Sequence, residues 1–248
     1  MLQCNRDLDE IISKELDNKD ADSIRGIVSK IARCVAHLHD NNFIHGDLKP
    51  KNIMRGNEGG YVLIDLDACA KLPLQYAGSK ISSSYIPPEM IYLNKITNKY
   101  DVRVSNNAPD VNISDYGYEF VVATTAYDSW SLGIILYFLC VGLSLFHSDR
   151  SENIIDQSAL ENLHKFTLTF KKEKLSKVDN HQAKNLISQL LNKDPTKRPT
   201  MKQVLMHPFL SMKSTARMVG DKAEFDVFLS YRVNGIIIII IIIMSGGK

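Results

Sequence analysis

The stretch HGDLKPKN, residues 45–52, places a histidine, a carboxylate, a lysine and an amide within eight residues. It follows a short apolar run, NNFI, that is typical of a strand. Phosphoryl transfer needs a positioned nucleophile, metal ions and neutralised charge rather than covalent catalysis, so a loop with these side chains could carry it. The rest of the chain must then supply elements that hold this loop in place.

The sequence around the loop predicts mostly helices with a few short strands. Helical spacing covers residues 7–18, 22–40 and 151–166, followed by 181–192 and 201–210, and a strongly apolar core helix is expected over 128–143. NIMRG and YVLIDLD read as a strand pair joined by a turn at NEGG, 57–60. Residues 71–88 contain three prolines and predict an irregular loop, and the Asn-, Asp- and Tyr-rich residues 93–120 predict a surface insertion.

Composition excludes several classes of partner. The net charge is +2 and the basic residues form no block, which argues against nucleic acid or an anionic membrane as the main partner. Four dispersed cysteines without a C-x-x-C pair argue against a zinc site or a disulfide framework and favour a cytoplasmic protein. The apolar run 130–146 lies near the lower length limit for a membrane span, and its polar content favours a buried helix.

Four motifs in this chain resemble those of one family. HGDLKPKN followed by LIDLD is similar to the catalytic loop and the D-F-G metal loop of eukaryotic-type protein kinases. SSSYIPPEM (82–90) resembles the end of the activation segment, YDSWSLGIILY (127–137) the central helix, and DPTKRPT (194–200) the segment that supplies the family's usual ion-pairing arginine. The resemblance covers residues 1–212 and implies the large, C-terminal lobe of a serine/threonine kinase, mainly α with a few short β strands.

The resemblance implies a role for each residue of the loop. Asp47 would accept or orient the proton of the substrate hydroxyl, and Lys49 would neutralise the moving phosphoryl group. Asn52 and Asp65 would bind ATP through Mg²⁺, because carboxylate and amide oxygens suit that ion. Met54 would contact the adenine from below. Asp65 has a plainer alternative as a carboxylate at the end of a strand.

Other residues would support the site without touching the substrate. His45 and Asp128 would be structural, with Asp128 buried and bonded to the backbone of the catalytic loop. Glu89 and Arg198 would form an ion pair. Ser82 aligns with the usual threonine that contacts the catalytic Asp and Lys, although it could also be an ordinary polar residue of a loop.

The chain departs from the family pattern at three points. No G-x-G-x-x-G motif or V-A-I-K-like lysine precedes the loop, so the small lobe that covers the ATP phosphates is expected to be missing. Gly46 replaces the usual arginine, which casts doubt on control by a phosphorylated activation loop through that contact. DLD replaces D-F-G, and Asp67 adds a negative charge where a flexible glycine is usual.

The far end of the chain carries a second resemblance. AEFDVFLSYR (223–232) is similar to the opening strand of a TIR domain, although a stray strand-like run is the alternative. One strand cannot bury a sheet face, so no TIR fold is expected here. The predicted organisation is a kinase lobe over 1–212, a linker over 213–222, a truncated TIR start over 223–234 and a low-complexity Ile-rich tail over 235–248.

The sequence therefore predicts a cytoplasmic protein serine/threonine kinase that transfers the γ-phosphoryl group of ATP to a protein hydroxyl with Mg²⁺. Its expected partners are ATP and a protein substrate, together with a missing small lobe and TIR regions, and neither nucleic acid nor a membrane span is expected. Two alternatives stay open. One is an inactive pseudokinase or scaffold, and the other is a remnant of a kinase–TIR signalling protein.

Overall fold

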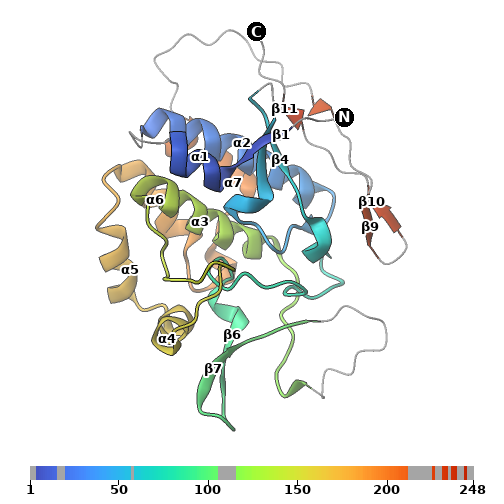
Figure 1. The fold of residues 1–248 in the computed structure, drawn as a ribbon, viewed down its shortest axis with the longest axis vertical. Coiled ribbons are helices and arrows are strands. Elements are labelled where there is room, and N and C mark those ends of the chain that lie inside the picture. The colour runs from blue at the N-terminus through green and yellow to red at the C-terminus, as the bar shows by residue number, and fades with distance from the viewer. Residues whose placement is uncertain are drawn as a thin grey trace.

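The computed structural model describes residues 4–15, 20–56, 59–105 and 116–211, together with the short segments 225–226, 231–233, 236–238 and 243–244 (Figure 1). Helices dominate the described part, as the sequence predicts. The helices are α1 (Leu8–Glu15), α2 (Ala21–Asp40), α3 (Thr125–Val141), α4 (Gln157–Lys165), α5 (Leu168–Leu175), α6 (His181–Leu190), α7 (Met201–Met206) and α8 (Pro208–Ser211).

Helix α3 is the centre of the core and lies between α2 and α6 (Figure 1). It is apolar on all sides, and Trp130 and Tyr137 are almost completely buried within it. Gly133 lets α6 approach closely, because a Cβ there would lie 2.9 Å from the Cβ of Leu190. The described residues include no helix that is long and apolar enough to cross a membrane. The prediction of a buried core helix is confirmed, with its bounds shifted from 128–143 to Thr125–Val141.

Helix α2 follows the predicted range within one residue. Asp20 caps its N-terminus by accepting a hydrogen bond from the Ser23 N–H, which satisfies one of the free donors of the first turn. Its buried face matches the predicted apolar spacing and packs on α3 and α7. Helix α1 covers Leu8–Glu15 of the predicted 7–18, and the predicted residues 16–18 lie outside the described part.

Two small antiparallel sheets flank the loop 45–52. The first has the order β1 (Cys4–Asp7), β3 (Ile53–Gly56), β4 (Tyr61–Leu63). The second pairs β2 (Phe43–Ile44) with β5 (Ala70–Lys71). The pair β3–β4 confirms the predicted strand pair after the loop, and the Ile64 N–H extends it by donating to the Asn52 carbonyl at 2.9 Å. Asn52 and Asp65 therefore leave this pair at the same end.

The predicted surface insertion contains regular structure. A hairpin of β6 (Ile91–Asn94) and β7 (Lys99–Val102) projects from the helical body (Figure 1). Asn94 stabilises its turn by accepting the Ile96 N–H, and Asn98 takes the left-handed conformation with φ 54°. Residues 106–115 lie outside the described part. Period-two alternation was too weak in this Asn-rich stretch for the strands to be predicted.

The C-terminal predictions fall largely outside the described residues. Within 213–248 the structure describes β8 (Phe225–Asp226), paired with β11 (Ile243–Met244), and β9 (Tyr231–Val233), paired with β10 (Ile236–Ile238). The linker, the TIR-like opening strand and the Ile-rich tail therefore stay predictions.

Candidate active site

One buried carboxylate on α3, that of Asp128, holds the loop 45–52 in place. Asp128 is fully buried and accepts the His45 N–H through Oδ2 at 2.8 Å and the Gly46 N–H through Oδ1 at 3.1 Å. His39 on α2 approaches Asp128 Oδ2 at 2.8 Å through Nε2. Burial acts to raise the pKa of Asp128, but His39 and the backbone donors outweigh burial and lower it. The predicted burial of Asp128 and its bonds to the loop backbone are present.

His45 is a buried support of the loop. Its Nε2 lies 3.1 Å from the Ile64 carbonyl and its Nδ1 accepts the Asp47 N–H at 3.3 Å, which suits a neutral ring that donates on one side and accepts on the other. Burial lowers the pKa of His45 despite the attraction of Asp128 and Asp47. The ring therefore links Asp47 to the residue that precedes Asp65.

Asp47 and Asn52 face each other across the loop. The Asn52 Nδ2 donates to the Asp47 carbonyl at 2.9 Å and to Asp47 Oδ2 at 3.1 Å. Lys49 Nζ approaches the same Oδ2 at 3.1 Å. Asp47 Oδ1 accepts no hydrogen bond from the described residues. One carboxylate oxygen is thus held by the protein while the other remains available to an incoming group.

The ammonium group of Lys49 contacts three acceptor oxygens. It donates to Ser82 Oγ at 2.7 Å and lies 3.1 Å from Asp47 Oδ2 and 3.2 Å from Glu152 Oε2. Burial acts to lower the pKa of Lys49, but the two carboxylates outweigh burial and raise it. Ser82 therefore lies at the site as the sequence predicts. Glu152 was not predicted, because no local motif marks a residue that reaches the loop from about a hundred positions away.

Asp65 lies just beyond the C-terminal end of β4, at the edge of the site. It has φ 58°, a left-handed conformation that Asp tolerates better than most residues. Lys80, in the loop 71–88, contacts Asp65 Oδ1 at 2.7 Å and Asp67 Oδ2 at 2.9 Å. The hydrogen bond from Lys80 lowers the pKa of Asp65. Lys80 was also missed by sequence reasoning, since a lone lysine in a loop carries no signal.

The remaining predicted residues lie beside the site or support it from the core. They are Met54, Glu89 and Arg198. Met54 is half-buried on β3, paired with Val62 of β4 and Asp7 of β1, so it lies on the strand that follows Asn52. Glu89 and Arg198 form a two-pronged ion pair, with both nitrogen–oxygen distances at 2.7 Å. The Arg198 guanidinium also lies 5.0 Å from the centre of the Trp130 ring. This pair ties the end of the activation segment to the core.

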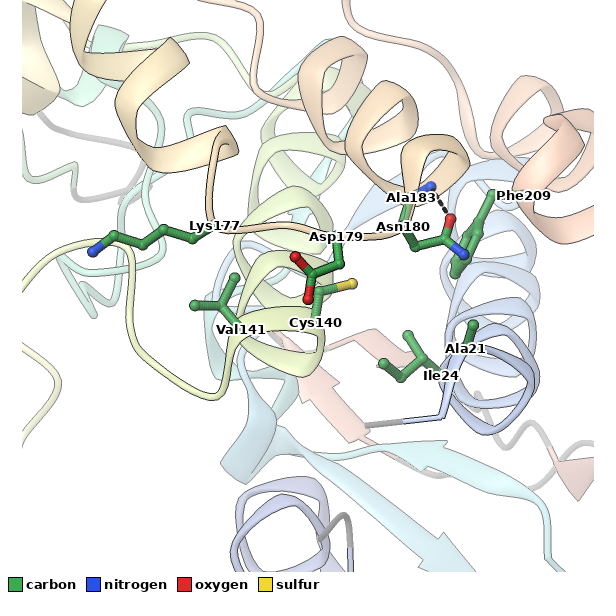
Figure 2. Close-up of a pocket in the computed structure, with 9 residues that line it drawn as sticks. All are labelled: Ala21, Ile24, Cys140, Val141, Lys177, Asp179, Asn180, Ala183 and Phe209. Carbon is green, nitrogen blue, oxygen red and sulfur yellow. Dashed lines mark hydrogen bonds between the residues drawn. The ribbon is translucent and has the colours of Figure 1, made fainter. Parts of the chain in front are cut away.

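A separate cavity lies away from these residues (Figure 2). It encloses about 550 Å³, and its walls come from α2, the C-terminal end of α3, the turn before α6, and α8. Burial raises the pKa of the Cys140 thiol in its wall to about 12, so that thiol is protonated and unreactive at neutral pH. The residues predicted for catalysis do not line this cavity.

Comparison with known proteins decides the family. A family model described as the protein kinase domain matches residues 2–103 and 112–210. The chain belongs to the protein kinase family. This kinase chain is 30% identical over 224 residues to smooth muscle myosin light chain kinase of Gallus gallus, across 90% of the chain and 10% of that protein.

Further relatives agree with this assignment. The chain is 30% identical over 194 residues to "Probable serine/threonine-protein kinase fhkA" of Dictyostelium discoideum, across 75% of the chain and 32% of that protein. That relative is named as a serine/threonine kinase, and the family model shows the protein kinase domain for this chain. Its fold resembles the twitchin kinase region of C. elegans, with a TM-score of 0.60 and 24% identity, across 85% of this chain and 32% of that one. The chain spans a third or less of the length of each of these proteins.

Proposed function

We propose that this site transfers the γ-phosphoryl group of ATP to a serine or threonine hydroxyl of a protein in the cytoplasm. The observation that carries the proposal is the arrangement of Asp47. Lys49 and Asn52 hold its Oδ2 at 3.1 Å each, while Oδ1 stays available to a substrate hydroxyl. Proton acceptance by a held carboxylate beside a charge-neutralising lysine is what this reaction requires.

The residues of the site divide the work between them. Asp47 orients the hydroxyl and takes its proton. Lys49 neutralises charge on the group being transferred, and Ser82 holds the Lys49 ammonium in place. His45 and Asp128 keep the loop rigid, so that Asp47 needs little reorganisation when the substrate arrives.

The oxygen ligands present fit Mg²⁺. Asp65 supplies a carboxylate, and the Oδ1 of Asn52 accepts no hydrogen bond from the described residues. The described residues contain no cluster of three or more His, Cys, Asp or Glu that could hold a metal. Mg²⁺ sites in proteins often use one or two carboxylates and fill the remaining positions with water and substrate phosphate. Bound Mg²⁺ would neutralise charge on the phosphates of ATP.

We further propose that full activity requires a small lobe with a glycine-rich loop and a phosphate-binding lysine. Transition-state charge is stabilised by metal, lysines and the phosphate-covering loop together. Of this set, the described site supplies Lys49 and the oxygen ligands for the metal. Met54 would contact one face of the adenine.

The test is phosphoryl transfer from radiolabelled ATP to a generic basic protein with Mg²⁺. Two chains are compared: the 248-residue chain and one extended at its N-terminus by a complete small lobe. We expect little transfer by the first, clear transfer to Ser and Thr by the second, and loss of that transfer on Asp47→Ala. Glu161→Gln, a change on the exposed face of α4, is the matched control and should leave transfer unchanged. Absence of transfer by the extended chain contradicts the proposal.

One observation favours the alternative of an inactive pseudokinase or scaffold. Lys80 contacts both Asp65 and Asp67, so a protein cation already neutralises the carboxylates of the expected metal site. Titration with Mn²⁺ separates the two functions. Binding that is lost on Asp65→Ala supports the active kinase, while absence of binding to the extended chain supports the scaffold.

A further inference from the structure

The Lys49 ammonium has no room for another acceptor in this conformation. Its three N–H groups meet Ser82 Oγ, Asp47 Oδ2 and Glu152 Oε2 at 2.7, 3.1 and 3.2 Å. An ammonium group offers three donors, so a phosphoryl oxygen can reach Lys49 only if one acceptor leaves. Glu152 is the candidate, because Ser82 and Asp47 belong to the activation segment and to the catalytic loop itself.

The Glu152 carboxylate bridges two lysines. Oε2 lies 3.2 Å from Lys49 Nζ and Oε1 lies 3.5 Å from Lys51 Nζ, so each oxygen faces a different ammonium group. Lys49 and Glu152 are mostly shielded from water, with side chains 16% and 13% exposed, and Lys51 lies at the edge at 43%. Two cations at this spacing suit the separated oxygens of a carboxylate or of a phosphate.

The backbone of the loop around Glu152 holds this residue in a fixed conformation. Glu152 has φ 65°, a left-handed conformation that a non-glycine residue adopts only when its surroundings enforce it. The Asp149 side chain accepts the backbone N–H groups of Ser151 and Asn153 at 2.8 and 2.9 Å, which forms a tight turn below Glu152.

The same loop is attached to the activation segment. The Ser84 N–H donates to the Glu152 carbonyl at 3.1 Å, and the Ile154 N–H donates to Ser83 Oγ at 2.7 Å. The position of the carboxylate is therefore set by backbone contacts on both sides of it, and not by the lysines alone.

We propose that Lys49 and Lys51 form a seat for a phosphate-type oxyanion, and that the Glu152 carboxylate fills this seat until the anion displaces it. The proposal rests on the proposed function, since the anion is the phosphoryl group being transferred. It adds Lys51 to the residues that bind this group and makes Glu152 an internal competitor. Carboxylate and phosphate repel each other, so the two cannot share the seat.

The experiment is calorimetric titration of the full chain with inorganic phosphate at low ionic strength, where exposed charges are least screened. We expect Glu152→Gln to bind phosphate about tenfold more tightly than the unmodified chain, because a carboxylate has left the seat. The control Glu161→Gln, which removes a carboxylate from an exposed pair with Lys165, should leave phosphate affinity unchanged. Adding Lys51→Met or Lys49→Met to Glu152→Gln should remove the gain.

Two results overturn the proposal: Glu152→Gln that binds phosphate no more tightly, or a gain that survives either lysine substitution. Should Glu152→Gln fail to fold, Glu152→Asp provides the same test. Aspartate tolerates the left-handed backbone and withdraws the carboxylate by one methylene, so tighter phosphate binding is again expected. Phosphate binding is independent of turnover. Tighter binding together with no transfer by the chain extended with a small lobe would uphold the seat and reject the proposed kinase activity, and transfer by the extended chain without tighter binding would do the reverse.

Discussion

The carboxylate of Asp128 accepts the backbone N–H of His45 at 2.8 Å, across 83 positions of sequence. Because Asp128 also accepts the Gly46 N–H and contacts His39, one side chain joins the core helix α3, the helix α2 and the catalytic loop. The geometry of Asp47 is therefore controlled from inside the core.

Asp128→Asn should destabilise the protein by about 1–3 kcal/mol, since an amide nitrogen cannot accept the backbone N–H that it would face. Urea denaturation measures the free energy of unfolding. Asp40→Asn, at an exposed pair with Lys202, is the control and should change it by less than about 0.5 kcal/mol. Equal effects of the two substitutions would contradict the anchoring role.

Gly46 is required by the shape of the loop. It has φ 76°, and a Cβ at this position would lie 2.3 Å from the Ala68 carbonyl oxygen. Gly59 has the same φ of 76° with nothing within 4 Å of its Cβ position, so it isolates the backbone cost. Gly59→Ala should cost about 1 kcal/mol and Gly46→Ala about 2–4 kcal/mol in the free energy of unfolding. Similar losses would show that the Ala68 contact is absent in solution.

His45 should make stability depend on pH in the weakly acidic range. Its pKa is lowered by burial, so below about pH 6.5 the unfolded chain takes up a proton that the folded chain refuses. Stability present at neutral pH is then lost as the pH falls from about 6.5 towards the lowered pKa. The free energy of unfolding measured between pH 7 and 5 should fall, and His45→Gln should flatten this slope. His147→Gln, at an exposed position, should leave the slope as it is.

Lys80→Met should tighten the binding of Mn²⁺ or Mg²⁺ to the full chain. Lys80 contacts Asp65 and Asp67 at 2.7 and 2.9 Å, and a divalent cation at Asp65 must displace or repel it. Since these three side chains are partly exposed, the gain is expected to be about two- to fivefold. Calorimetry or the Mn²⁺ paramagnetic resonance signal measures it, with Lys71→Met as the control. Weaker binding by Lys80→Met would indicate that Lys80 orders the carboxylates for the metal.

Local pattern was enough to predict the elements that carry the site. The apolar spacing of 22–40 and the strand pair around NIMRG and YVLIDLD appear almost as predicted, because each is determined by neighbours in sequence. The motifs also placed Asp47, Lys49, Asn52 and Ser82 together. The hairpin β6–β7 was missed because its stability comes from asparagine turn bonds and from packing beneath it.

The residues that complete the site could not be predicted from spacing. Glu152 reaches Lys49 from a loop beyond α3, and Lys80 reaches Asp65 from the loop 71–88. His39 sits among polar residues at the end of α2, where a histidine is ordinarily exposed. Each of these contacts depends on how distant segments fold onto each other, which periodicity along the chain does not encode.

The ion pair between Glu89 and Arg198 sets an order of events during synthesis. The two residues are 109 positions apart, and the guanidinium is supplied by a segment near the end of the described lobe. A ribosome that has translated the activation segment has not yet made its partner, and closing so long a loop must await the arrival of Arg198. A nascent chain arrested before that codon therefore lacks the ion pair that joins Glu89 to the rest of the lobe.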